Sequence, residues 1–253
     1  MAVDLSAMHL GKQAPRRDAR TLPLARYLTP EILPSAPAAF NWGANVTNWP
    51  MMGNNTIGDC TCAAAGHCIE EWTSDVGTPV VIPDAEIIAA YAAISGYNPV
   101  TGAHDVGATV IDVLNYWRRT GIGGHKILGY AALEPGNLAH VRDSVWIFGN
   151  CYIGLALPIT AQTQSAWAVP PGGPTGPGAP GSWGGHAVPV VAYDAESLTV
   201  VTWGALKKMT WGFWSAYCDE AYALLSTDFL KANATPDGIQ LTTLEQDIQQ
   251  ITS

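Results

Sequence analysis

One cysteine of this chain has the sequence setting of a nucleophile. Cys60 follows Gly58 and Asp59, and the small and apolar residues after it predict a helix that ends at residues 77–79. Asp59 is a typical N-cap residue, and the free N–H groups of a helix N-terminus favour a thiolate over a thiol. The alternative is a small cysteine buried in a core, and the helix alone does not separate the two.

A candidate base lies much later in the chain. Of the six histidines, His186 is the one inside an apolar, strand-like run that follows a loop rich in proline and glycine (170–185). A strand holds an imidazole rigidly enough to serve a thiol as general base. His67, which lies on the same predicted helix as Cys60, is expected on the surface or in the core.

The cluster of Cys60, Cys62, His67 and Cys68 raises the question of a metal site. Structural zinc sites space their cysteines by two to four residues and add a second ligand pair elsewhere. A Cys-x-Cys pair on a helix points its two sulfurs about 200° apart, and no second pair follows. We therefore expect no metal and no cofactor, with Cys62 and Cys68 as core residues.

Composition narrows the class of protein. The 253 residues are 48% apolar and only 13% charged, about half the usual charged share. The net charge of −9 argues against nucleic acid and anionic membranes as partners, because both need clustered basic residues. No segment has the length of a membrane helix, and the first residues lack the apolar core of a signal peptide. We expect a cytoplasmic protein; its oligomeric state is left open.

Helices precede strands along the chain, which is typical of an α+β fold. Periodicity and end signals predict four helices, over residues 59–76, 83–95, 108–120 and 135–148. Short apolar runs predict strands at 151–158, 186–194, 198–203 and 222–225. We divide the chain into an arm (1–38), a helical lobe (39–135), a β-rich lobe (136–225) and a C-terminal extension (226–253) with a short helix at 244–251.

In their order, these pieces resemble the papain family of cysteine peptidases over residues 38–225. The matching motifs are Phe40-Asn41-Trp42, Gly58-Asp59-Cys60, Gly185-His186-Ala187-Val188, and Thr202-Trp203-Gly204 followed by Trp211-Gly212. The resemblance implies a papain-like fold of two lobes, one helical and one an antiparallel, barrel-like sheet. A cleft would separate them, with Cys60 on one wall and His186 on the other.

The same resemblance implies a thiol hydrolase, most directly a peptidase, acting on a peptide or protein substrate through Cys60 and His186. Asn54 lies six residues before Cys60, where the family has the glutamine of its oxyanion hole, and Asn55 competes for that role. Thr202 lies sixteen residues after His186, the interval at which the family has an asparagine that orients the histidine. This departure leaves open a papain-like binding or structural protein without turnover. Acyl transfer or peptide ligation would use the same residues.

Further residues are implied for the substrate groove. Tyr97, Asn98 and Gly107 lie in a segment that resembles the glycine-rich wall of the family's cleft, and Trp183 and Trp203 are candidates for the other wall. Trp203 is equally a candidate for core packing behind the site. The acidic net charge favours a neutral or cationic peptide. We expect the arm to pack along the body as a strap and the 170–185 loop to border the active site.

Overall fold

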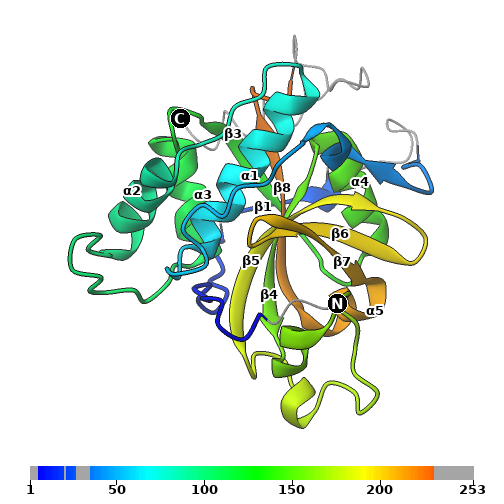
Figure 1. The fold of residues 1–253 in the computed structure, drawn as a ribbon. Helices are drawn as coiled ribbons and strands as arrows, with labels where there is room; N and C mark the ends of the chain where they lie inside the picture. The colour runs from blue at the N-terminus through cyan, green and yellow to red at the C-terminus, as the bar shows by residue number, and fades with distance from the viewer. Residues whose placement is uncertain (1–4, 20, 27–34, 231–253) are drawn as a thin grey trace.

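Three helices gather on one side of the protein, and the strands lie on the other side with two further helices (Figure 1). The structure is a computed structural model that describes residues 5–19, 21–26 and 35–230, so the helix expected at 244–251 lies outside the described residues. The helical side holds α1 (Cys60–Asp75), α2 (Asp84–Ser95) and α3 (Val110–Arg119). These helices agree with the sequence prediction to within about two residues at each end.

The β-rich side is one sheet whose strands run in the order β1-β3-β8-β4-β5-β6-β7, with β2 paired to β5. All of its pairs are antiparallel except β1 with β3. Its strands are β1 (Leu22–Pro23), β2 (Phe40–Asn41), β3 (Ile127–Leu133), β4 (Cys151–Leu157), β5 (Gly184–Tyr193), β6 (Ser197–Thr202), β7 (Ala205–Thr210) and β8 (Cys218–Ser226). Two further helices, α4 (Leu138–Phe148) and α5 (Trp211–Tyr217), pack on this sheet. The two-lobed α+β fold is therefore confirmed.

Helix α1 is buried along nearly its whole length, from Cys60 to Thr73. It packs against β5 on the sheet side and against α2 and α3 on the helical side. Small residues allow these close contacts: a Cβ added at Gly66 would lie 2.5 Å from the Met52 sulfur. Near its C-terminal end, Trp72 stacks on Trp117 with ring centroids 5.6 Å apart. The helix thus fixes Cys60 between the two lobes.

Several carboxyl groups are buried on and beside α1. Burial raises the pKa of Asp59 to about 8, and it raises the pKa values of Glu70 and Asp75 to about 7. Asp59 occupies the N-cap position, but its carboxyl makes no capping hydrogen bond, contrary to the role expected from the sequence. Buried carboxyls of this kind hold their protons in the folded protein at pH values where an unfolded chain releases them.

We therefore expect the free energy of unfolding to fall as the pH rises from 5 to 8. The pKa of Asp59 is about 8 in the folded protein against 3.8 as the ordinary value, so the folded state binds more protons throughout this window. Each such group contributes a slope of at most about 1.4 kcal/mol per pH unit. Asp59→Asn should make the slope shallower by up to that amount, as measured by urea unfolding at pH 5, 6, 7 and 8.

Asp194→Asn is the matched control for this measurement. The Asp194 carboxyl is exposed and paired with Lys208, which holds its pKa well below the usual range. It is ionised in both the folded and the unfolded state above pH 5, so its removal should leave the slope unchanged. A slope that Asp59→Asn does not alter would show that the Asp59 carboxyl is not desolvated.

Candidate active site

Helix α1 and strand β5 pack on each other, and each carries one of the two sequence-predicted catalytic residues. Cys60 opens α1, has a free thiol and is only 1% exposed. The backbone amides of Ala187 and Gly11 hydrogen bond to its sulfur and lower the pKa of the thiol. Ala187 directly follows His186 in β5. The strand packed on α1 therefore brings the backbone of the residue that follows His186 against the thiol.

Burial changes the pKa values of both Cys60 and His186. Burial, with a smaller contribution from Asp59, raises the pKa of Cys60 to about 11. Burial also lowers the pKa of His186 to about 3. The thiolate expected from the helix N-terminus is thus not the form of the resting protein, because loss of water around the sulfur outweighs the helix field.

The imidazole of His186 is held from two directions. Its Nε2 lies 2.8 Å from Thr202 Oγ1, and its ring stacks on Trp203 at 4.3 Å with an angle of 13° between the planes. Trp183 in turn packs on Trp203 at 5.6 Å. Because Nε2 faces Thr202, Nδ1 is the nitrogen left for proton transfer, and it has no hydrogen-bond partner among the described residues.

The sequence makes Trp203 a candidate both for the cleft wall and for core packing, and its position combines features of the two. Its side chain is 6% exposed, so it belongs to the core, yet its ring covers His186 directly. It has a positive φ of 45°, which is uncommon for a residue with a side chain. This conformation begins the turn between β6 and β7, so the turn that places the ring follows Thr202 immediately.

The two asparagines proposed for an oxyanion hole differ in their surroundings. Asn54 is buried, and its Nδ2 donates to the Ile57 carbonyl at 3.3 Å. Its amide also lowers the pKa of the adjacent Asp59. Asn55 is exposed. An amide nitrogen carries two hydrogens, and the Asp59 carboxyl competes for the one that the Ile57 carbonyl does not take.

The three residues expected in the glycine-rich wall have different surroundings. Gly107 lies in the cleft, where its N–H donates to Tyr91 Oη at 2.8 Å. The ring of Tyr97 packs on that of Tyr91, with centroids 5.3 Å apart and an angle of 34° between the planes. Asn98 shapes the exposed turn, since its Oδ1 accepts from the N–H groups of Val100 and Thr101.

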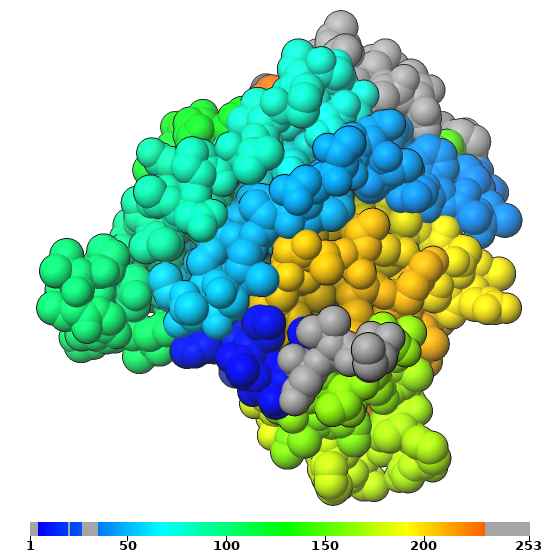
Figure 2. Space-filling model, viewed as in Figure 1, coloured from blue at the N-terminus to red at the C-terminus, as the bar shows by residue number. Residues whose placement is uncertain are grey.

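Residues 11–13 of the N-terminal arm lie between the two walls of the cleft, which differs from the expectation that the arm packs along the body as a strap. A Cβ added at Gly11 would lie 1.7 Å from the Gly58 carbonyl oxygen, so the arm approaches the Cys60 loop as closely as a backbone can. Figure 2 shows the arm, in dark blue, between atoms of the helical lobe and atoms of the sheet lobe. Sequence reasoning missed this role because a single Gly-Lys pair in an irregular segment carries no recognisable signal.

The other candidate ligands lie in the core. Cys62 and Cys68 are fully buried, and His67 binds the Pro50 carbonyl oxygen through Nε2 at 2.8 Å. Burial lowers the pKa of His67 to about 4. No group of three or more histidine, cysteine or acidic side chains suited to a metal ion occurs in the part of the chain that the structure describes.

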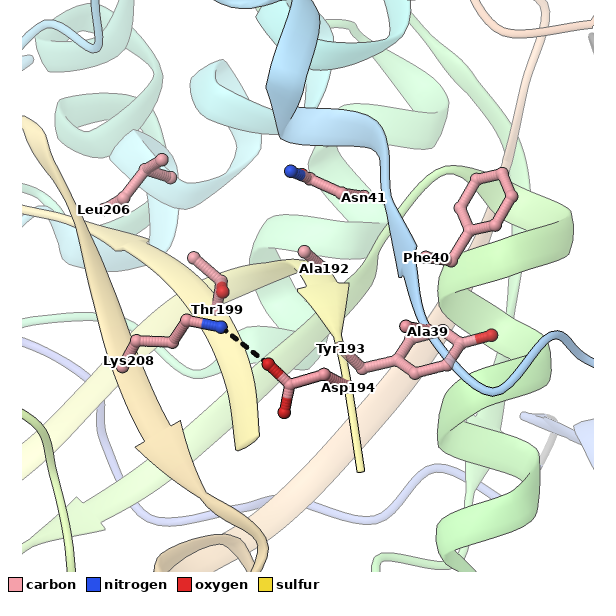
Figure 3. A pocket seen from close by; sticks show the side chains of 9 residues that line it. All are labelled: Ala39, Phe40, Asn41, Ala192, Tyr193, Asp194, Thr199, Leu206 and Lys208. Atoms are coloured by element: carbon pink, nitrogen blue, oxygen red, sulfur yellow. Dashed lines mark hydrogen bonds and ion pairs between the residues drawn. The ribbon is translucent and has the colours of Figure 1, made fainter. Parts of the chain in front are cut away.

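A separate pocket of about 570 Å³ lies where β2 meets β5 (Figure 3). Its lining includes the ion pair between Lys208 and Asp194 and contains neither Cys60 nor His186.

No helix within the described ranges is both long and apolar enough to cross a membrane.

Comparison with solved structures identifies the fold. Xylellain, a cysteine protease from Xylella fastidiosa, superposes with a TM-score of 0.64 at 14% identity, over 90% of this chain and 98% of that one. Procathepsin B S9 from Trypanosoma congolense gives 0.61 at 12% identity, over 88% of each chain. Digestive procathepsin L 3 from Tenebrio molitor gives 0.60 at 12%, over 87% of this chain and 77% of that one. The fold is that of the papain-like cysteine proteases.

Comparison by sequence gives a different result. No protein-family model matches the chain. No curated protein matches it either. The likeness is therefore one of fold, and the roles of the individual residues rest on the geometry described above.

We expect Gly11→Ala to expose Cys60. The added methyl group has no room against the Gly58 carbonyl, so the arm must shift away from the thiol. The rate of Cys60 alkylation by iodoacetamide at pH 8 should rise at least about tenfold, which corresponds to a fall of one unit in the thiol pKa. Peptide mapping after timed labelling measures the rate at each cysteine.

Gly172→Ala is the control, because nothing lies within 4 Å of a Cβ at that position. It should leave the labelling pattern unchanged, with the partly exposed Cys218 reacting before the four buried cysteines. Equal labelling of Cys60 in both variants would mean that the arm does not cover the thiol.

Proposed function

We propose that the protein is a papain-like thiol hydrolase that cleaves peptide bonds through Cys60 and His186. The observation that carries the proposal is the arrangement around the imidazole. His186 Nε2 is engaged by Thr202, Nδ1 has no partner among the described residues, and the thiol of Cys60 lies against the backbone of the next residue, Ala187. In this proposal Cys60 is the nucleophile, His186 is the base, and Thr202 is the group that orients the base.

The reaction begins when the arm leaves the cleft and water or substrate replaces it. His186 Nδ1 takes the proton from the Cys60 sulfur, and the thiolate attacks the peptide carbonyl carbon. The C–N bond then breaks as the imidazolium gives its proton to the leaving amine, which produces a thioester on Cys60. A water molecule, deprotonated by His186, hydrolyses the thioester to a carboxylic acid and restores the thiol.

Two donors are proposed for the negative oxygen of the tetrahedral intermediate. They are the backbone N–H of Cys60, at the N-terminus of α1, and the second hydrogen of the Asn54 amide. Removal of one such donor costs about 2.7–4 kcal/mol in enzymes where it has been measured. Asn54→Ala tests this role: in the Gly11→Ala background, it should lower kcat far more than it alters KM.

Thr202 is proposed as the positioning residue for His186. A hydroxyl accepts or donates, so it fixes the ring less strictly than a side chain that can only accept from Nε2–H. Turnover with Thr202 therefore depends on how well Trp203 and the hydroxyl together hold the imidazole.

The rival hypothesis, a papain-like protein that binds peptides without cleaving them, predicts the same fold and no turnover.

Peptide hydrolysis should be detectable in the Gly11→Ala variant with fluorogenic peptide libraries. Adding Cys60→Ala or His186→Ala should abolish cleavage, because the first removes the nucleophile and the second a base worth about 10²–10⁴ in rate. Thr202→Val should lower kcat roughly tenfold with little change in KM and should shift the pH profile of kcat. Thr202→Ser should restore both.

Thr199→Val is the matched control for Thr202, since both threonines lie on β6 and are nearly buried. Thr199 lines the separate pocket, whose walls do not include His186, so kcat should not change. Absence of cleavage by a Gly11→Ala variant whose Cys60 alkylates rapidly would contradict the peptidase proposal and favour the binding protein.

A further inference from the structure

The arm carries a charged side chain into the interior. Lys12 is only 1% exposed, and its Nζ lies 2.9 Å from Asp219 Oδ2 and 3.2 Å from Glu220 Oε1. It also donates to the Gln13 carbonyl at 3.3 Å. Lysine is almost never buried without partners, and here the two acidic partners come from the start of β8.

The space around Lys12 fits an unbranched basic side chain. Gly154 of β4 faces Glu220 of β8, and a Cβ there would lie 2.0 Å from Lys12 Cε. Tyr222 Oη donates to Glu220 Oε2 at 3.1 Å and so fixes the carboxyl. Burial raises the pKa of Glu220, and Lys12 lowers it. The glycine leaves room for an aliphatic stem, and the carboxyls receive its charged end.

The backbone of the arm is bound as an extended peptide between the two walls of the cleft. On the sheet side, Lys12 N–H donates to the Gly185 carbonyl at 3.1 Å. On the helical side, Ala108 N–H donates to the Gly11 carbonyl at 2.8 Å, and Gln13 N–H donates to the Ala108 carbonyl at 3.0 Å. Main-chain pairing of this kind is a general way to bind peptides, with pockets for side chains setting the specificity.

Glycines on both walls make this pairing possible. A Cβ at Gly185 would lie 2.1 Å from the Lys12 carbonyl oxygen, and one at Gly107 would lie 1.9 Å from that of Gly11. Gly11 is also the residue whose amide hydrogen bonds to the Cys60 sulfur. The acidic pocket therefore receives the side chain of Lys12, the residue that follows the one whose backbone contacts the thiol.

We propose that Asp219 and Glu220 form a specificity subsite for a lysine or arginine side chain of a peptide substrate, and that Lys12 occupies this subsite within the same chain. The inference rests on the proposed function and deepens it, since it names basic peptides as the substrate class. A neutral side chain would leave the partly exposed Asp219 and the nearly buried Glu220 without a cation, and an acidic one would meet repulsion. A bound basic peptide must displace the arm.

The first test measures how firmly the arm occupies the pocket in the full chain. Lys12→Met and Lys12→Glu should each speed alkylation of Cys60, by at least about tenfold for the charge reversal, while Lys12→Arg should keep it slow. Lys126→Glu is the control, because that lysine is exposed and its Nζ donates to the Arg119 carbonyl oxygen. Equal rates for Lys12→Arg and Lys12→Glu would overturn the charge-based subsite.

The second test uses a peptide added to the full-length Lys12→Glu or Lys12→Met protein. A synthetic peptide of residues 5–16 should protect Cys60 from iodoacetamide at a concentration at least about tenfold lower than the same peptide carrying Lys12→Met. Glu220→Gln in the protein should shrink this difference. Equal protection by both peptides would overturn the inference, and no turnover is needed to measure it.

Cleavage of a peptide library by the Lys12→Glu protein separates the two proposals. A preference for lysine or arginine near the cut supports both. Cleavage without any basic preference overturns the subsite and leaves the peptidase proposal standing. Selective protection by the lysine peptide without cleavage supports the subsite and overturns the peptidase proposal.

Discussion

The packing of a buried helix against one strand is the contact on which the whole site depends. Helix α1 is enclosed by α2 and α3 on one side and by β5 on the other, so the positions of its first residue and of β5 are fixed together. That single interface sets the thiol of Cys60 against the backbone of Ala187, the residue that follows His186. The rest of the fold supports it: β4 and β6 flank β5, and β6 leads into Thr202 and Trp203.

Burial also keeps the thiol of Cys60 in its less reactive, protonated form. A thiol at a helix N-terminus is favoured as a thiolate only while the ion can be solvated or paired. The arm contacts the sulfur through Gly11, and burial moves the pKa values of Cys60 and His186 apart, to about 11 and about 3. Neither group is then charged at neutral pH. Coverage by the arm therefore acts on the reactivity of the thiol as well as on access to the cleft.

The parts that sequence reasoning predicted well are those with strong local patterns. Periodicity and end signals define α1, α2 and α3, and continuous β-branched runs define β5 and β6. The strands it missed lack such patterns: β1 and β2 have two residues each, β3 contains glycine and alanine, and the edge strand β7 contains Lys207 and Lys208. Their pairing is decided by neighbouring strands rather than by their own residues. Asp59 likewise looks like an N-cap, yet its burial leaves the carboxyl without that bond.

The contents of the cleft could not be predicted, because they depend on contacts between residues far apart in the chain. Lys12 meets Asp219 more than two hundred residues later, and nothing in either local sequence points to the other. What makes the contact possible is space left by glycines: Gly107 and Gly185 on the walls, Gly11 on the arm and Gly154 beneath the lysine stem. The residues around each glycine in the sequence do not indicate that it makes a close contact. A buried lysine between two carboxylates is stable only when all of these close approaches occur together, so the acidic pocket and the arm that fills it must be considered as one structure.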